Sequence, residues 1–444
     1  MSLALSALII LAAAWALFRK VEVRLVLILA ALALSVLAGQ LDALLRTFLH
    51  ALADEKFVVP ICCAMGFAHV LKLTQCDTHL VLLLTKPLRR VRVLLVPGTV
   101  LAGVLVNVPI ISQTSTALTL GAVLVPVLRA AGVPLPTIGA ALLLGSSIGG
   151  ELLNPGAPEL ATIAKVVSDR FEQPLSAADC VGRVAPLLLL HLAVAVPLFT
   201  WLTWRRAEPA PAEPQAEPEA TPAIRYDKAA LPLLPLALLF LVGPPLNLFT
   251  VPESWLLSPD SHGTYGARLI GAAMLVGVAA AALTDRQAAS RTMVSFFEGA
   301  GYAYAHIISL IVVGTCFGKS VELSGLAAEL GALITRFPAL LVPAAAALPL
   351  TFAALSGSGI GATNSLYGFF AEPCRALDAD PVLIGVVVAL ASAAGRTMSA
   401  VAAVALMCAS LTQTTSLDLV RRVAVPLLAG MTAVTLVAMF LVHG

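Results

Sequence analysis

Long apolar runs separated by short polar breaks dominate this sequence. Six of them reach the length of a membrane span: residues 2–18, 25–45, 184–204, 231–249, 267–283 and 423–442. A helix needs about 17–25 apolar residues to cross a bilayer, and the hydrocarbon core holds no water to satisfy free backbone N–H and C=O groups. The chain is therefore expected to be a polytopic all-α membrane protein. With the shorter runs included, it has roughly ten to fourteen crossing or re-entrant segments.

Composition excludes a soluble domain. Of 444 residues, 59% are hydrophobic and 12% charged, whereas soluble domains are about 25% charged. The net charge of +2 gives no reason to expect a nucleic-acid partner, so the expected surroundings are a lipid bilayer. No basic region precedes the run 2–18, and no small-residue cleavage site follows it before Arg19 and Lys20. We therefore expect a span there and not a signal peptide.

Cofactor and metal motifs are missing from the sequence. The seven cysteines show no CxxC spacing and no histidine partner, which is typical of small core residues. The sequence has no GxxxxGK[ST] loop, so nucleotide-driven pumping is not expected. The prediction is no cofactor, with Na⁺ or H⁺ as a coupling ion.

A polar tract divides the chain near its midpoint. Residues 205–228 read RRAEPAPAEPQAEPEATPAIRYDK, a Pro/Glu-rich composition typical of a solvated linker. Residues 67–74 (FAHVLKLT) align with 317–324 (FGKSVELS) at an offset of 250. We therefore predict a first repeat over 1–204, a cytoplasmic linker over 205–228 and a second repeat over 229–444.

Positive charge predicts that the two repeats are inverted. Lys and Arg in short loops stay cytoplasmic, and Arg19, Lys20 and Arg24 follow the first span, which places the N-terminus outside. The segment 86–92 is strongly cationic, whereas its counterpart 319–336 is diluted by glutamates. Because this bias swaps between the halves, inverted repeats with both termini outside are expected.

Two segments, one in each half, read as copies. Residues 138–155 (IGAALLLGSSIGGELLNP) align with 384–401 (IGVVVALASAAGRTMSAV) at an offset of 246. Just beyond a shared glycine the first carries Glu151 and the second Arg396. An ionisable group within a span costs roughly 2.5–3.5 kcal/mol on insertion scales and usually marks a pathway or site.

A second pair of polar breaks lies upstream. These are 107–117 (NVPIISQTSTA) and 356–365 (SGSGIGATNS). Unwound backbone at membrane depth must line a cavity or be buried in protein, where its N–H groups can bind carboxylates and its carbonyls can bind Na⁺. The alternative is close helix packing by small residues. The predicted helix breaks are Pro109, Gly149, Gly150, Pro155, Gly357, Gly359, Gly361 and Gly395.

Three individual residues leave alternatives open. Arg396 can bind a substrate carboxylate bidentately or form an internal salt bridge with Glu151. Glu159 is expected at the membrane interface in an ordinary solvated role. Ser358, between two glycines, would suit an intramembrane serine hydrolase only with a histidine within reach, and no motif marks one.

The motifs GSSIGGELLNPG (145–156), AGRTMS (394–399) and LDLVRR (417–422) resemble the DcuC family of anaerobic C4-dicarboxylate carriers, within the ion transporter superfamily. The resemblance runs from near Phe57 to the C-terminus. It implies inverted repeats with re-entrant hairpins, and exchange or ion-coupled transport of fumarate, succinate, malate or aspartate across the bacterial inner membrane. It also suggests an elevator motion. Ala400 stands where that family often has proline, which predicts a weaker helix break.

Residues and resemblance together predict a secondary transporter and no enzyme, with a homodimer allowed but not required. The alternatives are a carrier of another organic anion, a Na⁺/H⁺ exchanger and, in another class, a serine hydrolase. The substrate-binding candidates are Ser112, Gln113, Thr114, Ser115, Thr116, Glu151, Asn154, Ser356, Ser358, Thr363, Asn364, Arg396, Thr397 and Ser399.

Overall fold

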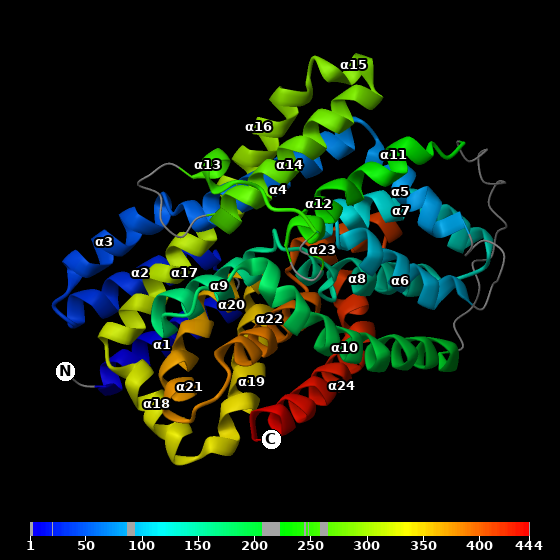
Figure 1. Ribbon diagram of the computed structural model, residues 1–444. Helices are drawn as coiled ribbons and strands as arrows, with labels where there is room; N and C mark the ends of the chain where they lie inside the picture. Colours follow the sequence, from blue (N-terminus) through cyan, green and yellow to red (C-terminus); the bar gives the residue numbers. More distant parts are fainter. Residues whose placement is uncertain are drawn as a thin grey trace.

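The structure is a computed structural model that describes residues 3–19, 21–86, 94–206, 223–243, 246, 248–257 and 265–443. Helices make up most of this part of the chain, and it contains no β-strand (Figure 1). The predicted all-α fold is confirmed. Arg89, Arg90 and Arg92 of the cationic loop, and residues 207–222 of the linker, lie outside the described residues.

The helices before the linker are α1 (Leu3–Phe18), α2 (Val23–Leu37), α3 (Leu41–Leu52), α4 (Glu55–Leu73), α5 (Cys76–Thr85), α6 (Leu95–Asn107), α7 (Gln113–Ala130), α8 (Leu135–Ser147), η3 (Gly150–Leu153), α9 (Pro158–Phe171) and α10 (Ala177–Arg205).

The helices after it are α11 (Tyr226–Ala230), η4 (Leu231–Leu233), α12 (Leu234–Val242), α13 (Glu253–Leu256), α14 (Tyr265–Thr284), α15 (Arg286–Ala289), α16 (Thr292–Ala303), η5 (Tyr304–Ile308), α17 (Ser309–Leu323), α18 (Leu326–Arg336), η6 (Pro338–Leu340), α19 (Leu341–Ser356), α20 (Gly359–Leu366), η7 (Tyr367–Phe370), α21 (Ala371–Ala376), α22 (Pro381–Thr397), α23 (Ala403–Thr412) and α24 (Ser416–His443).

Seven helical stretches of the described chain are long and apolar enough to cross a membrane. Six further apolar helices, among them α5, α6 and α23, have 10–17 residues. At 1.5 Å per residue, a ten-residue helix covers about 15 Å, half of the roughly 30 Å hydrocarbon core. The described chain is thus a multi-pass membrane protein in which full spans alternate with half-length helices.

Two of the predicted spans are wrong in detail. The run 25–45 is divided, because α2 ends at Leu37 and α3 begins at Leu41 after Gly39, whose φ is +67°. The run 231–249 contains only η4 and α12, which end at Val242. The helix ends before Gly243, whose backbone is extended, and two prolines follow it in the sequence. Hydropathy alone overlooks such interruptions.

The two halves pack in a reciprocal pattern. Helix α4 of the first half packs against α14 and α16 of the second, while α17 of the second packs against α2 and α3 of the first. Likewise α9 packs against α20 and α22, while α23 packs against α7 and α8. Such exchanged contacts are what a twofold axis between two repeats would give. The repeat boundaries and the inversion across the membrane stay predictions.

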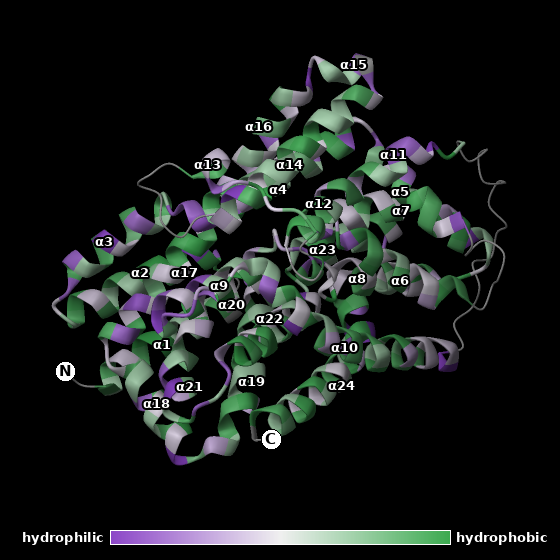
Figure 2. Ribbon diagram, in the orientation of Figure 1, coloured by the Kyte–Doolittle hydropathy of each residue, from purple (hydrophilic) through white to green (hydrophobic). Residues whose placement is uncertain are grey.

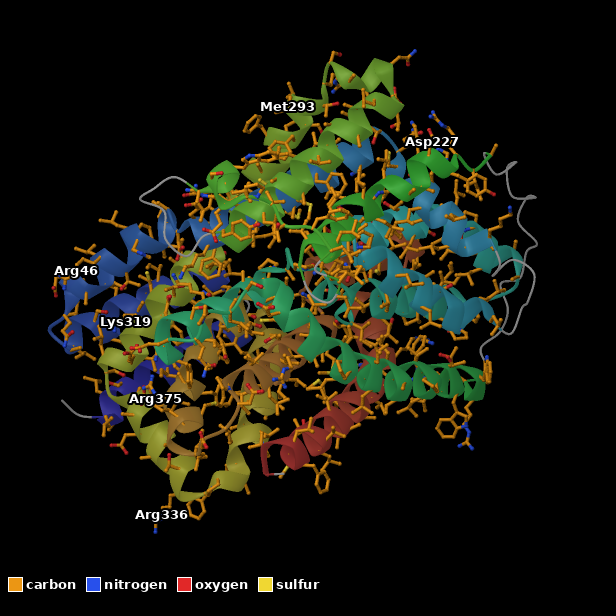
Figure 3. All side chains as sticks on the ribbon, viewed as in Figure 1. Arg46, Asp227, Met293, Lys319, Arg336 and Arg375 are labelled. Carbon is orange, nitrogen blue, oxygen red and sulfur yellow. The ribbon has the colours of Figure 1, made fainter. Side chains whose placement is uncertain are left out.

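Helices α8 and α22 form the centre of the molecule. From Thr137 to Ser147 and from Val382 to Thr397 every residue is buried, as expected for helices that are apolar on all sides. The long helices α10 and α24 pack against each other and against α22 (Figure 1). Apolar residues cover most outward helix faces, and polar residues concentrate at helix ends and connections (Figure 2). Labelled charged residues such as Arg46, Asp227 and Arg336 extend from the periphery (Figure 3).

Candidate functional site

The first break separates α6 from α7, and polar side chains satisfy its freed backbone. Helix α6 ends at Asn107, and Pro109 follows. The Asn107 side chain donates to the Ile110 carbonyl (3.0 Å) and accepts the Glu151 N–H (3.1 Å). Thr116 Oγ1 also donates to Ile110 O (3.2 Å), and Ser112 Oγ accepts the Ser115 N–H, which caps α7. Buried backbone groups need such partners, so Asn107 and Thr116 hold the break open.

The second break lies between α8 and α9. Gly149 has φ +122°, a conformation that L side chains rarely adopt, and the short η3 follows. Asn154 Nδ2 donates to the Val108 carbonyl (2.8 Å) and its Oδ1 accepts the Gly156 N–H (2.9 Å). Asn154 therefore ties the second break to the first, and Pro155 directs the chain into α9.

The third break separates α19 from α20 at Gly357, whose φ is +76°. Ser358 Oγ accepts the Gly361 N–H (3.0 Å) and caps α20, while Ser356 Oγ accepts the Ser358 N–H (3.2 Å). Further along α20, Asn364 Nδ2 donates to the Ile311 carbonyl (2.7 Å) and to Thr315 Oγ1 (3.1 Å) of α17.

The fourth break follows α22, and here the predicted break residues need correction. Gly395 lies inside α22, which ends only at Thr397, and Gly359 and Gly361 lie inside α20. A Cβ at Gly395 would lie 2.2 Å from the Leu350 carbonyl, so this glycine allows close packing of α22 on α19. The break itself is the turn 398–402 before α23.

The aligned segments meet at the centre through Arg396 and Glu151. Arg396 Nη2 lies 2.6 Å from Glu151 Oε1, and both side chains are buried. Arg396 Nη2 also donates to the Ser147 carbonyl (2.8 Å), and Nε donates to Ser147 Oγ (3.2 Å). Thr397 Oγ1 lies 2.7 Å from Ser147 O. The internal ion pair, one of the two roles considered for Arg396, is therefore present.

Glu159 is part of the same centre. Its exposure is 2%, and its Oε1 lies 3.8 Å from Arg396 Nη1, so the prediction of a solvated interfacial role is wrong. Helix α9 packs between α10, α20 and α22 and carries Glu159 inward in its first turn. Sequence analysis also missed Ser147 and Asn107 as contacts of the centre. One sequence signal was available: Pro158 is typical of the first position of a helix, which would place Glu159 in the first turn of a helix and not in a loop.

Several polar atoms at the centre are buried and have no hydrogen-bond partner in the described structure. They are Arg396 Nη1, Glu151 Oε2, Glu159 Oε2, Ser392 Oγ, Ser399 Oγ and Thr363 Oγ1. Burying an unpaired polar group costs free energy, so such groups usually mark a functional role or a bound species. Three of these atoms belong to the ion-paired cluster of Arg396, Glu151 and Glu159, which makes this cluster the candidate site.

The remaining predicted residues surround this centre or flank it. Gln113 Nε2 donates to Glu151 Oε1 (3.1 Å), which brings the start of α7 to the centre. Thr114 Oγ1 lies 3.3 Å from Ser112 Oγ, within the α7 cap, and Ser115 supplies the N–H of that cap. The structure thus brings Gln113, Glu151, Arg396 and Thr397 together. Asn154, Thr116, Ser356 and Ser358 instead bond to the backbone of the breaks.

The fold and a polar centre built from broken helices define a membrane transporter, and the comparisons agree. A Haemophilus influenzae protein, described as an uncharacterized transporter, is 41% identical over 130 residues, which are 90% of that protein and 29% of this chain. The chain belongs to the family of this transporter. A second such transporter from the same organism is 26% identical over 196 residues, 44% of this chain and 66% of that protein. No known family model matches the chain.

Two solved structures share the fold. The YdaH transporter of Alcanivorax borkumensis has a TM-score of 0.61 at 18% identity, covering 95% of this chain and 96% of that one. Neisseria gonorrhoeae MtrF, described within a class of antimetabolite efflux pumps, has a TM-score of 0.58 at 13% identity and covers 90% and 85%. At these identities the likeness shows the fold alone. The chain is a transporter and not an enzyme.

Proposed function

We propose that this protein is a secondary transporter of small carboxylic acids, with C4-dicarboxylates such as succinate and fumarate as the substrate class, and that Arg396 binds a substrate carboxylate. One observation carries the proposal. Arg396 Nη2 and Nε are engaged by Glu151 and Ser147, whereas Nη1 is buried without a hydrogen-bond partner. A guanidinium edge of this kind matches a carboxylate oxygen.

The surroundings of Nη1 complete an anion cradle. A Cβ at Gly359 would lie 3.1 Å from Arg396 Nη1, so the N-terminus of α20 faces the guanidinium. The first N–H groups of a helix have no partner within it. The side-chain oxygen of Ser358 accepts the Gly361 N–H, and its backbone oxygen accepts the Ala362 N–H. The N–H groups of Gly359 and Ile360 are left for a ligand. Ser392 and Thr363 add buried hydroxyls one turn along α22 and α20.

Gly359 provides a test of this cradle. Gly359→Ala is expected to lower uptake at least tenfold, because the new methyl group would lie 3.1 Å from Arg396 Nη1 and 3.2 Å from the Ser392 carbonyl oxygen and would push the start of α20 away from the guanidinium. Initial uptake rates in proteoliposomes and the thermal unfolding midpoint would check this. Gly301→Ala, where a Cβ meets nothing within 4 Å, is the matched control. Wild-type uptake by Gly359→Ala would remove the α20 terminus from the site.

Charge balance requires a cation to accompany the substrate. Two carboxylates, Glu151 and Glu159, share the single guanidinium of Arg396. With all three ionised the centre carries −2 + 1 = −1, and an added dianion would make −3. Because burying uncompensated charge is strongly unfavourable, a co-bound H⁺ or Na⁺ is part of the proposal.

The same excess of carboxylate favours a second candidate, exchange of Na⁺ for H⁺ without an organic substrate. Both acidic side chains retain one oxygen without a partner, Glu151 Oε2 and Glu159 Oε2, which suits a small cation. Arg396 Nη1, which faces Glu159 at 3.8 Å but has no hydrogen-bond partner, instead suits an anion.

An elevator motion between the two membrane faces also belongs to the proposal. It is supported by the ion pairs that link α9 to its neighbours, such as Arg170–Glu322 (2.9 Å) and Lys56–Asp169 (3.0 Å). Such exposed ion pairs stabilise a contact by only about 0–1 kcal/mol each, so they can break and form again with other partners during a movement of α9. A bacterial inner membrane and a homodimer stay predictions.

One experiment separates these candidates. Purified protein in proteoliposomes would be tested for counterflow of radiolabelled succinate and fumarate and, in parallel, for Na⁺-driven change of internal pH. We expect acid counterflow that unlabelled C4 acids compete away. Na⁺/H⁺ exchange with no acid counterflow would establish the second candidate in place of the first.

A further inference from the structure

A cavity lies beyond the candidate site, about one turn along α9 and about one and a half turns along α20. Its volume is about 210 Å³, and it lies between α9, α17 and the end of α20. Its floor is formed by Thr162, Thr315, Asn364 and Ser365. Sites for drug-sized ligands have roughly 300–1,000 Å³, so this volume suits part of a small metabolite.

Two of the helices around the candidate site, α9 and α20, also line this cavity. Glu159 and Thr162 are three residues apart and share a face of α9. On α20, Asn364 and Ser365 follow Gly359 by five and six residues, about 8–9 Å along the helix axis. Along both helices the cavity therefore follows on the groups that surround Arg396.

The floor offers both donors and acceptors of hydrogen bonds. Both Nδ2 hydrogens of Asn364 bond within the protein, to Ile311 O and Thr315 Oγ1. Among the described residues, its Oδ1 accepts one long hydrogen bond, from Thr162 Oγ1 at 3.5 Å, and has a second lone pair for a ligand. Ser365 Oγ is buried without a partner and can donate, as can the hydroxyl of Thr315.

Charged residues at the mouth favour entry of anions. Lys165, Arg170 and Lys319 line it together with Asp169 and Glu322, so the lining carries +3 − 2 = +1. Figure 3 labels Lys319 on α17, and Arg170 reaches Glu322 from α9. Lys165 is also paired with Asp54, which joins the mouth to the start of α4. The positive excess would attract an acid towards the cavity.

We propose that this cavity is a second substrate subsite, which holds the end of the acid remote from Arg396 and selects a group that both donates and accepts hydrogen bonds. A bare carboxylate only accepts, and Asn364 Oδ1 would repel it. The matching groups are an amide, a hydroxyl or a carboxyl that retains its proton. A dicarboxylate therefore enters as its singly protonated form, in keeping with the excess negative charge at the centre. This inference rests on the proposed function.

Ser365→Ala tests the subsite cleanly, because removing a hydroxyl without a partner leaves no buried group unpaired. The ligands are three four-carbon acids: succinamate, with a distal amide, succinate, and butyrate, with a distal methyl group. In the wild type we expect succinamate to bind most tightly and butyrate most weakly. Ser365→Ala is expected to weaken succinamate binding about tenfold and to leave butyrate binding unchanged.

Isothermal titration of the purified full-length protein would measure these affinities. Ser6→Ala is the matched control, because it removes another buried hydroxyl without a partner but lies in α1. It should leave the affinities for all three acids unchanged. If the wild type binds the acids and Ser365→Ala binds each of them as tightly as the wild type does, the subsite is wrong and the proposed function stands. If the wild type binds none of the acids, both are overturned.

Discussion

Replacing Arg396 by alanine is expected to reduce succinate uptake at least a hundredfold and to destabilise the protein at the same time. The guanidinium neutralises Glu151 at 2.6 Å and faces Glu159 at 3.8 Å, and all three side chains are buried. Removing one partner of a buried ion pair costs about 3–5 kcal/mol. Lost uptake in this variant alone would therefore not distinguish substrate binding from a structural role.

Two further variants separate these roles. Arg396→Lys keeps the positive charge but loses the planar fork that engages Ser147 and Glu151 together and leaves Nη1 without a hydrogen-bond partner. The triple variant Arg396→Met, Glu151→Gln and Glu159→Gln removes the charged cluster as a unit, which is often close to neutral for stability. We expect both to insert and fold, and both to bind succinate at least tenfold more weakly.

The measurements are uptake rate, thermal unfolding midpoint and succinate affinity by titration. Arg183→Ala is the control, because its side chain is 67% exposed and its pair with Asp380 spans 3.5 Å. It should leave all three values unchanged. Succinate affinity equal to the wild type in the triple variant would assign Arg396 a purely structural role.

The membrane architecture could be predicted because each of its signals is local. A run of about 20 apolar residues has few alternatives to a span, and the division into halves rests on the matches 67–74 with 317–324 and 138–155 with 384–401. In the structure Phe67 and Phe317 lie in α4 and α17, which exchange reciprocal contacts with the opposite half. Local sequence therefore carried the membrane-spanning part of the fold, and the division into two repeats stays a prediction.

The centre could be predicted only in part, because burial and partner choice depend on tertiary packing. Glu159 reads as an interfacial residue from its distance to Pro155, yet α20 and α22 enclose it. Gly395 reads as a helix break, yet the Leu350 carbonyl beside it explains the glycine. Asn154 and Thr116 read as ligands, yet they satisfy carbonyls of the first break. None of these neighbours is adjacent in sequence.

Replacing Glu159 by glutamine is expected to remove the dependence of uptake on the coupling cation. Glutamine keeps the shape of the side chain and removes the charge that Arg396 only partly balances. From the elements packed against α9, the charged side chains that act on Glu159 are Glu151 of η3 and Arg396 of α22. Lys56 and Arg170 are paired with Asp169 and Glu322 at the other end of α9. Glu159 is thus the acid whose compensation is least complete.

The sign of the effect follows from linkage. If the wild type binds succinate together with a proton, each ligand raises the affinity for the other, so succinate uptake should rise as the pH falls. In Glu159→Gln one charge is permanently absent, so between pH 8 and pH 6 uptake should follow only the singly protonated fraction of succinate and should lose the additional pH dependence that Glu159 contributes. If Na⁺ is the coupling ion, the variant should lose Na⁺ stimulation instead.

Glu172→Gln, at the exposed end of α9, should behave as the wild type. A Glu159→Gln variant that keeps both dependences would show that the cation binds elsewhere, and the pairing of two acids with one arginine would then serve stability alone.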